Sequence, residues 1–211
     1  TTLFRSMDAY EPVWSPDGSL ITFYAFANDA FTVWLMNADG SGLIELTERT
    51  ADARYPDFTP DGSAVVYSSD EESGYAIWQY DLISKQRTRI TSVADTGYQE
   101  PEGPYFSGAG NAVYPTPSPD GTQLAFVIDG PEHVLVLKEV GSANPPRTLY
   151  AGAILGAPTW APDGSALYVV SVEAGQGHLA RVPVDGGNVE RLVDGGDVFP
   201  FRPSLRPDGG L

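Results

Sequence analysis

The stretch that decides the fold is residues 12–23, PVWSPDGSLITF. Its centre, Pro16-Asp17-Gly18, has the composition of a tight turn. Proline sets φ at about −65°, aspartate can accept a hydrogen bond from the backbone that follows, and glycine adopts the left-handed conformation without steric cost. Apolar and β-branched residues stand on both sides of this turn. The stretch therefore predicts a β-hairpin with Pro-Asp-Gly at its tip.

This hairpin sequence recurs along the chain. The glycines of the Pro-Asp-Gly copies are Gly18, Gly62, Gly121, Gly164 and Gly209, so successive copies are 44, 59, 43 and 45 residues apart. A proline stands six residues before each glycine, at Pro12, Pro56, Pro115, Pro158 and Pro203. An apolar residue stands 28 residues after each of the first four, at Leu46, Ile90, Leu149 and Leu192. A register kept over four copies indicates one repeated supersecondary unit.

Each unit contains four short runs rich in β-branched and aromatic residues, separated by Gly, Pro, Asp and Asn. Such runs are typical of strands, and no segment has a helical period long enough to predict a helix. A four-stranded antiparallel meander of about 40 residues, repeated side by side, is the blade of an all-β propeller. We expect a single β-propeller segment over 1–211, with blades at about 10–47, 55–91, 113–150 and 157–193, an insertion at 93–112, and partial blade strands at 3–7 and 203–211.

The repeat resembles a known family. PVWSPDGSLITF, followed by VWLMNADGS and ELT within residues 12–47, is similar to the TolB-like, WD40-like propeller repeat, and the similarity covers essentially the whole chain. The third unit departs from it, with Thr116-Pro117 where an aromatic residue is usual. Residues 197–203, DVFPFRP, resemble more weakly the propeller portion of amidohydrolase-associated TolB-like proteins. The resemblance implies the fold, but such propellers include periplasmic scaffolds as well as domains of serine peptidases, amidohydrolases and polysaccharide lyases.

Four complete units and two partial ones predict part of a larger ring. A propeller hides its strand edges by closing. We therefore expect six or more blades in the complete propeller. The alternative is a closed ring of five blades in which residues 3–7 and 203–206 share one blade.

The charge and composition of the chain exclude several kinds of partner. With 12 Lys and Arg against 28 Asp and Glu, the formal net charge is −16, which opposes binding to nucleic acid and to anionic membranes. The absence of cysteine excludes disulfides and thiol chemistry within these residues. No apolar run reaches about 18 residues, so we expect no membrane insertion. The acidic, lysine-poor composition favours a periplasmic or secreted location, and the start Thr1-Thr2 is typical of a processed product or an excised segment.

Candidate binding residues fall on one face of the expected propeller. If the first strand of each blade is innermost, the second-to-third and fourth-to-first loops open on the face opposite the Pro-Asp-Gly turns, and this face carries the insertion. Five residues there are candidate ligand contacts: Arg54, Tyr98, Tyr105, His178 and Arg202.

The two arginines allow two interpretations. Each stands one or two residues before a repeat proline, where it can clamp a carboxylate or phosphate of a ligand. Each also has a carboxylate nearby in sequence, Asp52 for Arg54 and Asp197 for Arg202. Structural pairing with these neighbours is the favoured interpretation.

The tryptophans fall at repeated positions. Trp14 and Trp160 share one position of the unit, and Trp34 and Trp78 share another. Residues in register across blades predict packing positions before ligand contacts.

No catalytic motif is found in these residues. His133 and His178 lie on different predicted blades, and the sequence contains no His-x-His, His-Glu-x-x-His or Gly-x-Ser-x-Gly. The aspartate of each Pro-Asp-Gly is expected to stabilise its turn rather than to bind a metal. We therefore expect no catalytic residue, no metal and no cofactor.

These observations favour a non-catalytic TolB-like propeller that acts as a scaffold for a protein or peptide partner, or for a small ligand at the propeller mouth. The alternative is the N-terminal propeller part of a hydrolase, either a metal-dependent amidohydrolase or a prolyl-oligopeptidase-like serine peptidase, in which the propeller gates substrate access. A catalytic motif elsewhere in the same polypeptide would distinguish the two.

Overall fold

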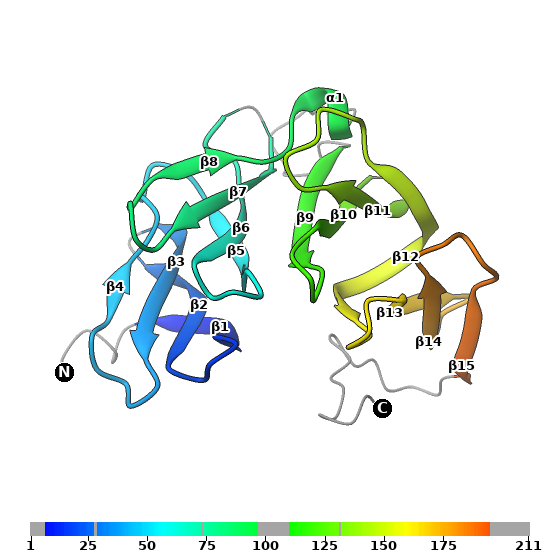
Figure 1. The fold of residues 1–211 in the computed structure, drawn as a ribbon, viewed down its shortest axis with the longest axis horizontal. Coiled ribbons are helices and arrows are strands. Elements are labelled where there is room, and N and C mark those ends of the chain that lie inside the picture. Colours follow the sequence, from blue (N-terminus) through cyan, green and yellow to red (C-terminus); the bar gives the residue numbers. More distant parts are fainter. Residues whose placement is uncertain (1–6, 28, 73, 97–109, 131, 195–211) are drawn as a thin grey trace.

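The computed structural model describes residues 7–27, 29–72, 74–96, 110–130 and 132–194, which form an almost entirely β structure. Figure 1 shows four blades that follow one another along an arc. The total number of blades stays a prediction, because the partial strands expected at 3–7 and 203–211 lie outside the described residues, apart from Met7.

The first two blades are separate four-stranded antiparallel sheets with their strands in sequence order, which is the meander predicted from the repeat. The first blade consists of β1 (Asp8–Trp14), β2 (Leu20–Ala27), β3 (Ala30–Asn37) and β4 (Ile44–Glu45). The second consists of β5 (Ala53–Phe58), β6 (Ala64–Ser69), β7 (Ala76–Asp81) and β8 (Arg87–Arg89).

The third and fourth blades share a strand. One seven-stranded antiparallel sheet contains β9 (Asn111–Pro117), β10 (Gln123–Asp129), β11 (His133–Glu139), β12 (Arg147–Trp160), β13 (Ala166–Glu173), β14 (Gln176–Pro183) and β15 (Glu190–Asp194). The first half of β12 pairs with β11 and its second half pairs with β13. The sequence predicted a connection between residues 150 and 157, but the segment AGAILGA at 151–157 contains no proline or polar turn residue and continues as strand.

The first strands of the blades are innermost, as expected. β1 contacts β5, β5 contacts β9, and β9 contacts β12, whereas β4, β8 and β15 lie on the outer side of the arc (Figure 1). The connections between second and third strands therefore open on one face, and the Pro-Asp-Gly turns on the other.

The four described Pro-Asp-Gly copies all form first-to-second hairpins, as predicted. Their glycines have φ between +70° and +72°, the left-handed region that only glycine enters without strain. Each aspartate accepts a hydrogen bond from the backbone N–H two residues later, as in Asp17 with Ser19 at 3.0 Å. Hydrogen bonds from the Ser15 hydroxyl, then from Ser19, lower the pKa of Asp17 to about 2.

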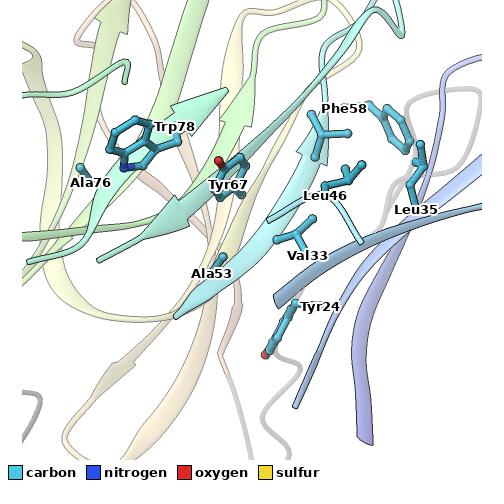
Figure 2. Close-up of a cluster of buried hydrophobic side chains, with 10 residues drawn as sticks. Tyr24, Val33, Leu35, Leu46, Ala53, Phe58, Tyr67, Ala76 and Trp78 are labelled. Atoms are coloured by element: carbon cyan, nitrogen blue, oxygen red, sulfur yellow. The ribbon is translucent and has the colours of Figure 1, made fainter. Parts of the chain in front are cut away.

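Apolar side chains from facing sheets fill the space between blades. Figure 2 shows Val33 and Leu46 of the first blade gathered with Phe58 and Tyr67 of the second. The other described interfaces repeat this arrangement: Val66 and Ile77 pack with Leu124 and Phe126, and Val127 and Leu137 pack with Trp160 and Leu167. Trp34 and Trp78 are buried, as their shared repeat position predicted.

The other tryptophan pair behaves differently. Trp160 is 7% exposed and packs on the third blade, where its indole N–H donates to the Thr116 carbonyl at 3.0 Å. Trp14 occupies the same repeat position but is 57% exposed. The packing prediction holds for Trp160 and is wrong for Trp14, because no described blade precedes the first one.

The insertion after the second blade begins with one helical turn, α1 (Val93–Thr96), which the sequence did not predict. Its Asp95 forms a buried ion pair with Lys138 of β11, with Nζ and Oδ1 2.7 Å apart. Burial alone would raise the pKa of Asp95, but hydrogen bonds from Lys138 and Ser92 outweigh it and lower the pKa. These contacts hold α1 at the outer edge of the third blade, near the hairpin that follows β11 (Figure 1). Within the described residues, no helix has the length and apolar character needed to cross a bilayer.

The tryptophan pair provides a matched test of blade packing. We expect Trp160→Ala to lower the free energy of unfolding by about 3–5 kcal/mol, the usual cost of deleting a buried large aromatic side chain. Trp14→Ala should cost less than about 1 kcal/mol, as for exposed positions. Urea unfolding followed by circular dichroism measures both. Equal losses would mean that Trp14 is packed as deeply as Trp160.

The turn aspartates predict a specific acid sensitivity. Because the pKa of Asp17 in the folded chain lies below its value in the unfolded chain, Asp17 stabilises the fold above about pH 4, and this contribution is lost as the pH falls towards 2. We expect Asp17→Asn to reduce the unfolding free energy at pH 6 and to converge with the unmodified chain near pH 2. Urea titrations across this range measure the difference. Glu132→Gln, at an exposed position in the connection between β10 and β11 and outside the Pro-Asp-Gly turns, is the control. A difference between Asp17→Asn and the unmodified chain that does not depend on pH would contradict the assignment.

Candidate functional site

A bulge in each inner strand shapes the mouth of the arc. The pairing of the first and second strands shifts register between Tyr10 and Val13 in the first blade, and at the same place, next to the repeat proline, in the other three. The residue before that proline has a positive φ in three blades: 46° at Glu11, 56° at Tyr55 and 55° at Tyr114. Such values are uncommon outside glycine. Their repetition at one position shows that they belong to the bulge, which re-aims the side chains around it.

Aromatic rings from three blades meet at this end of the inner strands. We call Tyr10, Tyr24, Phe26, Phe31, Tyr55 and Tyr114 the aromatic mouth. Tyr10 stacks on Tyr24 with ring centroids 5.4 Å apart and an interplanar angle of 21°. Tyr24 meets the edge of Tyr55 at 5.5 Å, and Tyr55 lies 4.1 Å from Tyr114. The result is a continuous file of rings from the first blade to the third.

Some rings of the aromatic mouth are buried, and others are accessible to solvent. Burial raises the pKa of both Tyr24 and Tyr114, and the nearby Glu11 carboxylate raises both further. Tyr10 is 43% exposed and Phe26 is 41% exposed, and both lie against Phe31. The mouth therefore exposes aromatic surface to solvent on rings that are held in place by their contacts with neighbouring rings.

Beside the file, Asp52 organises a polar cluster. Its carboxylate accepts a hydrogen bond from the Phe31 backbone N–H at 2.9 Å and from Arg54 Nη2 at 2.6 Å. The Asp52 backbone N–H donates to Asp70 Oδ1 at 2.8 Å, and the Tyr75 hydroxyl lies 3.3 Å from Asp52 Oδ2. Asp52 thus connects the first blade to the second at the rim of the mouth.

Arg54 is a structural member of this cluster. Its guanidinium carbon lies 3.9 Å from the centre of the Phe31 ring, a close cation–π contact. Burial opposes its charge, but the hydrogen bond to Asp52, together with the negative charges of Asp52 and the neighbouring tyrosines, outweighs burial and raises the pKa of Arg54. The favoured prediction for Arg54, pairing with Asp52, is confirmed.

Of the other four predicted site residues, three lie outside the described residues and one lies in a strand. Tyr98, Tyr105 and Arg202 lie outside the described residues. His178 was expected in an exposed loop, and this is wrong: it lies within β14, opposite Ser171 and Asp194, and is 6% exposed. The sequence predicted the third strand of this blade at 179–182, but β14 begins at Gln176 because the turn before it is a short one at Ala174 and Gly175, both with positive φ.

Sequence reasoning missed much of the aromatic mouth. Neither Tyr24 nor Phe31 was assigned to a site from the sequence. Tyr114 had a usable signal, because it directly precedes its repeat proline in the same way as Tyr55. In the described part of the chain, no three His, Asp or Glu side chains gather into a group that could hold a metal ion.

The fold and this site define a TolB-like β-propeller. A family model described as the lipoprotein LpqB beta-propeller domain matches residues 88–198, more than half of the chain. The chain therefore belongs to the LpqB β-propeller domain family. No curated protein matches it in sequence.

Solved structures show the same fold. A putative TolB from Agrobacterium tumefaciens is 22% identical with a TM-score of 0.76, and the match covers 95% of this chain and 72% of that one. TolB from Acinetobacter baumannii is 21% identical with a TM-score of 0.64, covering 84% of this chain and 44% of that one. A puromycin-hydrolysing peptidase from Mycobacterium tuberculosis is 19% identical with a TM-score of 0.63, covering 88% of this chain and 29% of that one. The chain thus spans less than half the length of the Acinetobacter protein and less than a third of the peptidase.

The Asp52 cluster predicts a stability effect with an internal control. We expect Asp52→Ala to lower the unfolding free energy by about 1–3 kcal/mol, because it leaves Arg54 half-buried without its charged partner. Asp52→Asn should cost less, since the amide oxygen can still accept a hydrogen bond. Glu45→Ala, which removes the more exposed ion pair with Arg49, should cost at most about 1 kcal/mol. Thermal and urea unfolding measure all three, and equal effects of Asp52→Ala and Glu45→Ala would show that the Asp52 cluster is not structural.

Proposed function

We propose that the chain is a non-catalytic propeller scaffold that binds a protein or peptide partner through the aromatic mouth. The observation that carries the proposal is the set of rings that three blades fix in place while leaving Tyr10 and Phe26 accessible. Tyrosine gives a large amphipathic contact area at a low cost in conformational entropy, and aromatic residues are enriched at protein interfaces.

The relatives support this proposal at the level of class. TolB structures share the fold, and the family description names a lipoprotein. We therefore propose a location outside the cytoplasm, at the cell envelope. The acidic composition agrees with a partner that is neither nucleic acid nor an anionic membrane surface.

A second candidate is the propeller domain of a hydrolase, which gates substrate access. The observation in its favour is the likeness to propellers that belong to peptidases, such as the puromycin-hydrolysing enzyme from Mycobacterium tuberculosis. In this case the chemistry would lie in another domain of the same polypeptide, and the aromatic mouth would contact the substrate in transit.

The scaffold proposal is tested by selecting random displayed peptides on the immobilised chain. We expect binders whose affinity falls at least about tenfold on Tyr10→Ala, because loss of the accessible stacked ring removes contact area. Ile83→Ala, an exposed apolar position in a third-to-fourth hairpin on the opposite face, should leave affinity unchanged. Absence of any Tyr10-dependent binder, or equal losses on both variants, would refute the aromatic mouth as the binding surface.

A further inference from the structure

The interface between the second and third blades contains a cavity with a volume of about 340 Å³. The Pro-Asp-Gly turns of both blades line it, so it opens on the face opposite the aromatic mouth. Its other walls are formed by Val66, Gln79, Ile90, Pro117, Leu124 and Val140. Val66 and Leu124 are buried in the core cluster of this interface, whereas Val140 is 50% exposed. The cavity therefore reaches from the surface into the packed layer between two blades.

A departure from the repeat explains the cavity. Four residues before the turn glycine, the second blade has Phe58 and the fourth has Trp160. Both rings are buried against the preceding blade, and Figure 2 shows Phe58 gathered with Leu35 and Leu46. The third blade has Pro117 at this position, so the space that an aromatic ring fills in the neighbouring interfaces stays open here. Protein interiors contain few voids larger than a water molecule, which makes this interface an exception.

A second departure gives the cavity a polar group. Gln79 lies 17 residues after the turn glycine of the second blade, where the first blade has the buried Leu35. The half-buried side-chain amide of Gln79 can donate and accept hydrogen bonds at the cavity wall. A volume of about 300–1,000 Å³, mostly apolar walls and a few polar groups are typical of small-molecule sites.

The opening of the cavity is negatively charged, because Asp61 and Asp120 line it. Their two turns touch: a Cβ added to Gly121 would lie 3.3 Å from Cγ of Pro60. No lysine or arginine lines the cavity in the described part of the chain, and both carboxylates accept hydrogen bonds from hydroxyl and backbone N–H groups of their own turns. These hydrogen bonds lower the pKa of both aspartates, so both are ionised at neutral pH. Neither charge is neutralised by a basic side chain among these contacts.

We infer that this cavity binds a small organic cation that consists of an aromatic ring and an ammonium group. The ring occupies the place that Phe58 and Trp160 take in the neighbouring interfaces, where its apolar surface is removed from water. The ammonium group lies at the opening, where charge-assisted hydrogen bonds to Asp61 and Asp120 hold it. This site is on the face opposite the aromatic mouth and does not depend on the proposed scaffold function.

Three probes separate the contributions of ring and charge. Phenethylammonium has both, 3-phenylpropionate combines the ring with a negative charge, and butylammonium has the positive charge without the ring. We expect phenethylammonium to bind the complete 211-residue chain at least about tenfold more tightly than either of the others, as measured by isothermal titration calorimetry near neutral pH. In NMR spectra of the unmodified chain, its amide shift changes should centre on Val66 and Leu124.

Variants of the walls and of the opening test the two halves of the site. Pro117→Phe introduces the ring of the second blade and should weaken phenethylammonium binding at least about tenfold, because the ligand's place is filled. Pro117→Leu fills less of the space and should cause a smaller loss. Asp61→Asn combined with Asp120→Asn should reduce the preference for phenethylammonium over phenylpropionate to less than about threefold. Asp17→Asn, the same change in the turn of the first blade, should keep the preference.

Circular dichroism verifies that each variant is folded, and the shift mapping does not depend on any variant. Failure of phenethylammonium to bind, shift changes centred elsewhere, or unchanged binding to a folded Pro117→Phe or Pro117→Leu chain would overturn the site. Equal affinity for phenethylammonium and phenylpropionate, or a preference that survives loss of both aspartates, would overturn its assignment to a cation.

Discussion

The bulge before the repeat proline in each inner strand is the constraint on which the rest of the molecule depends. Two strands that paired without it would keep strict side-chain alternation, and every second residue would face the neighbouring blade. The bulge breaks this alternation once per blade, at the end of the strand where the mouth lies. The Pro-Asp-Gly end keeps its regular pairing and packs against the next blade. One local irregularity thus separates the residues that pack the blades together from those at the mouth.

The sequence predicted what depends on local chemistry. Proline, aspartate and glycine act within a few residues, so the turns and the meander could be inferred from their spacing, and Asp52 and Arg54 were close enough in sequence for their pairing to be expected. The aromatic mouth could not be assembled in this way, because the contact between Tyr55 and Tyr114 depends on how two blades pack. The burial of Trp160 and the exposure of Trp14 also depend on a neighbouring sheet, which no pattern within one repeat can report.

The carboxylates of this chain fall into two groups, those with structural partners and those at the rim of the mouth. Many carboxylates have structural partners: the turn aspartates accept hydrogen bonds from nearby serine or threonine residues, and Asp95 is paired with Lys138 at the outer edge of the third blade. Others stand at the rim with few basic residues among them. Net charge alone therefore overstates how much of the surface is available to attract a partner. Position, rather than count, decides which carboxylates matter for recognition.

The continuous strand β12 has a consequence for how the arc loses its structure. A strand hydrogen-bonded to β11 at one end and β13 at the other cannot be released from one blade without straining its pairing in the other. The third and fourth blades should therefore open and close as one cooperative unit, with amide protons of both exchanging together. The connection between the second and third blades runs through the insertion instead, without a shared strand. The first blade likewise shares no strand with the second. Relative motion of these three blades would therefore change the spacing of Tyr24, Tyr55 and Tyr114, and with it the width of the mouth.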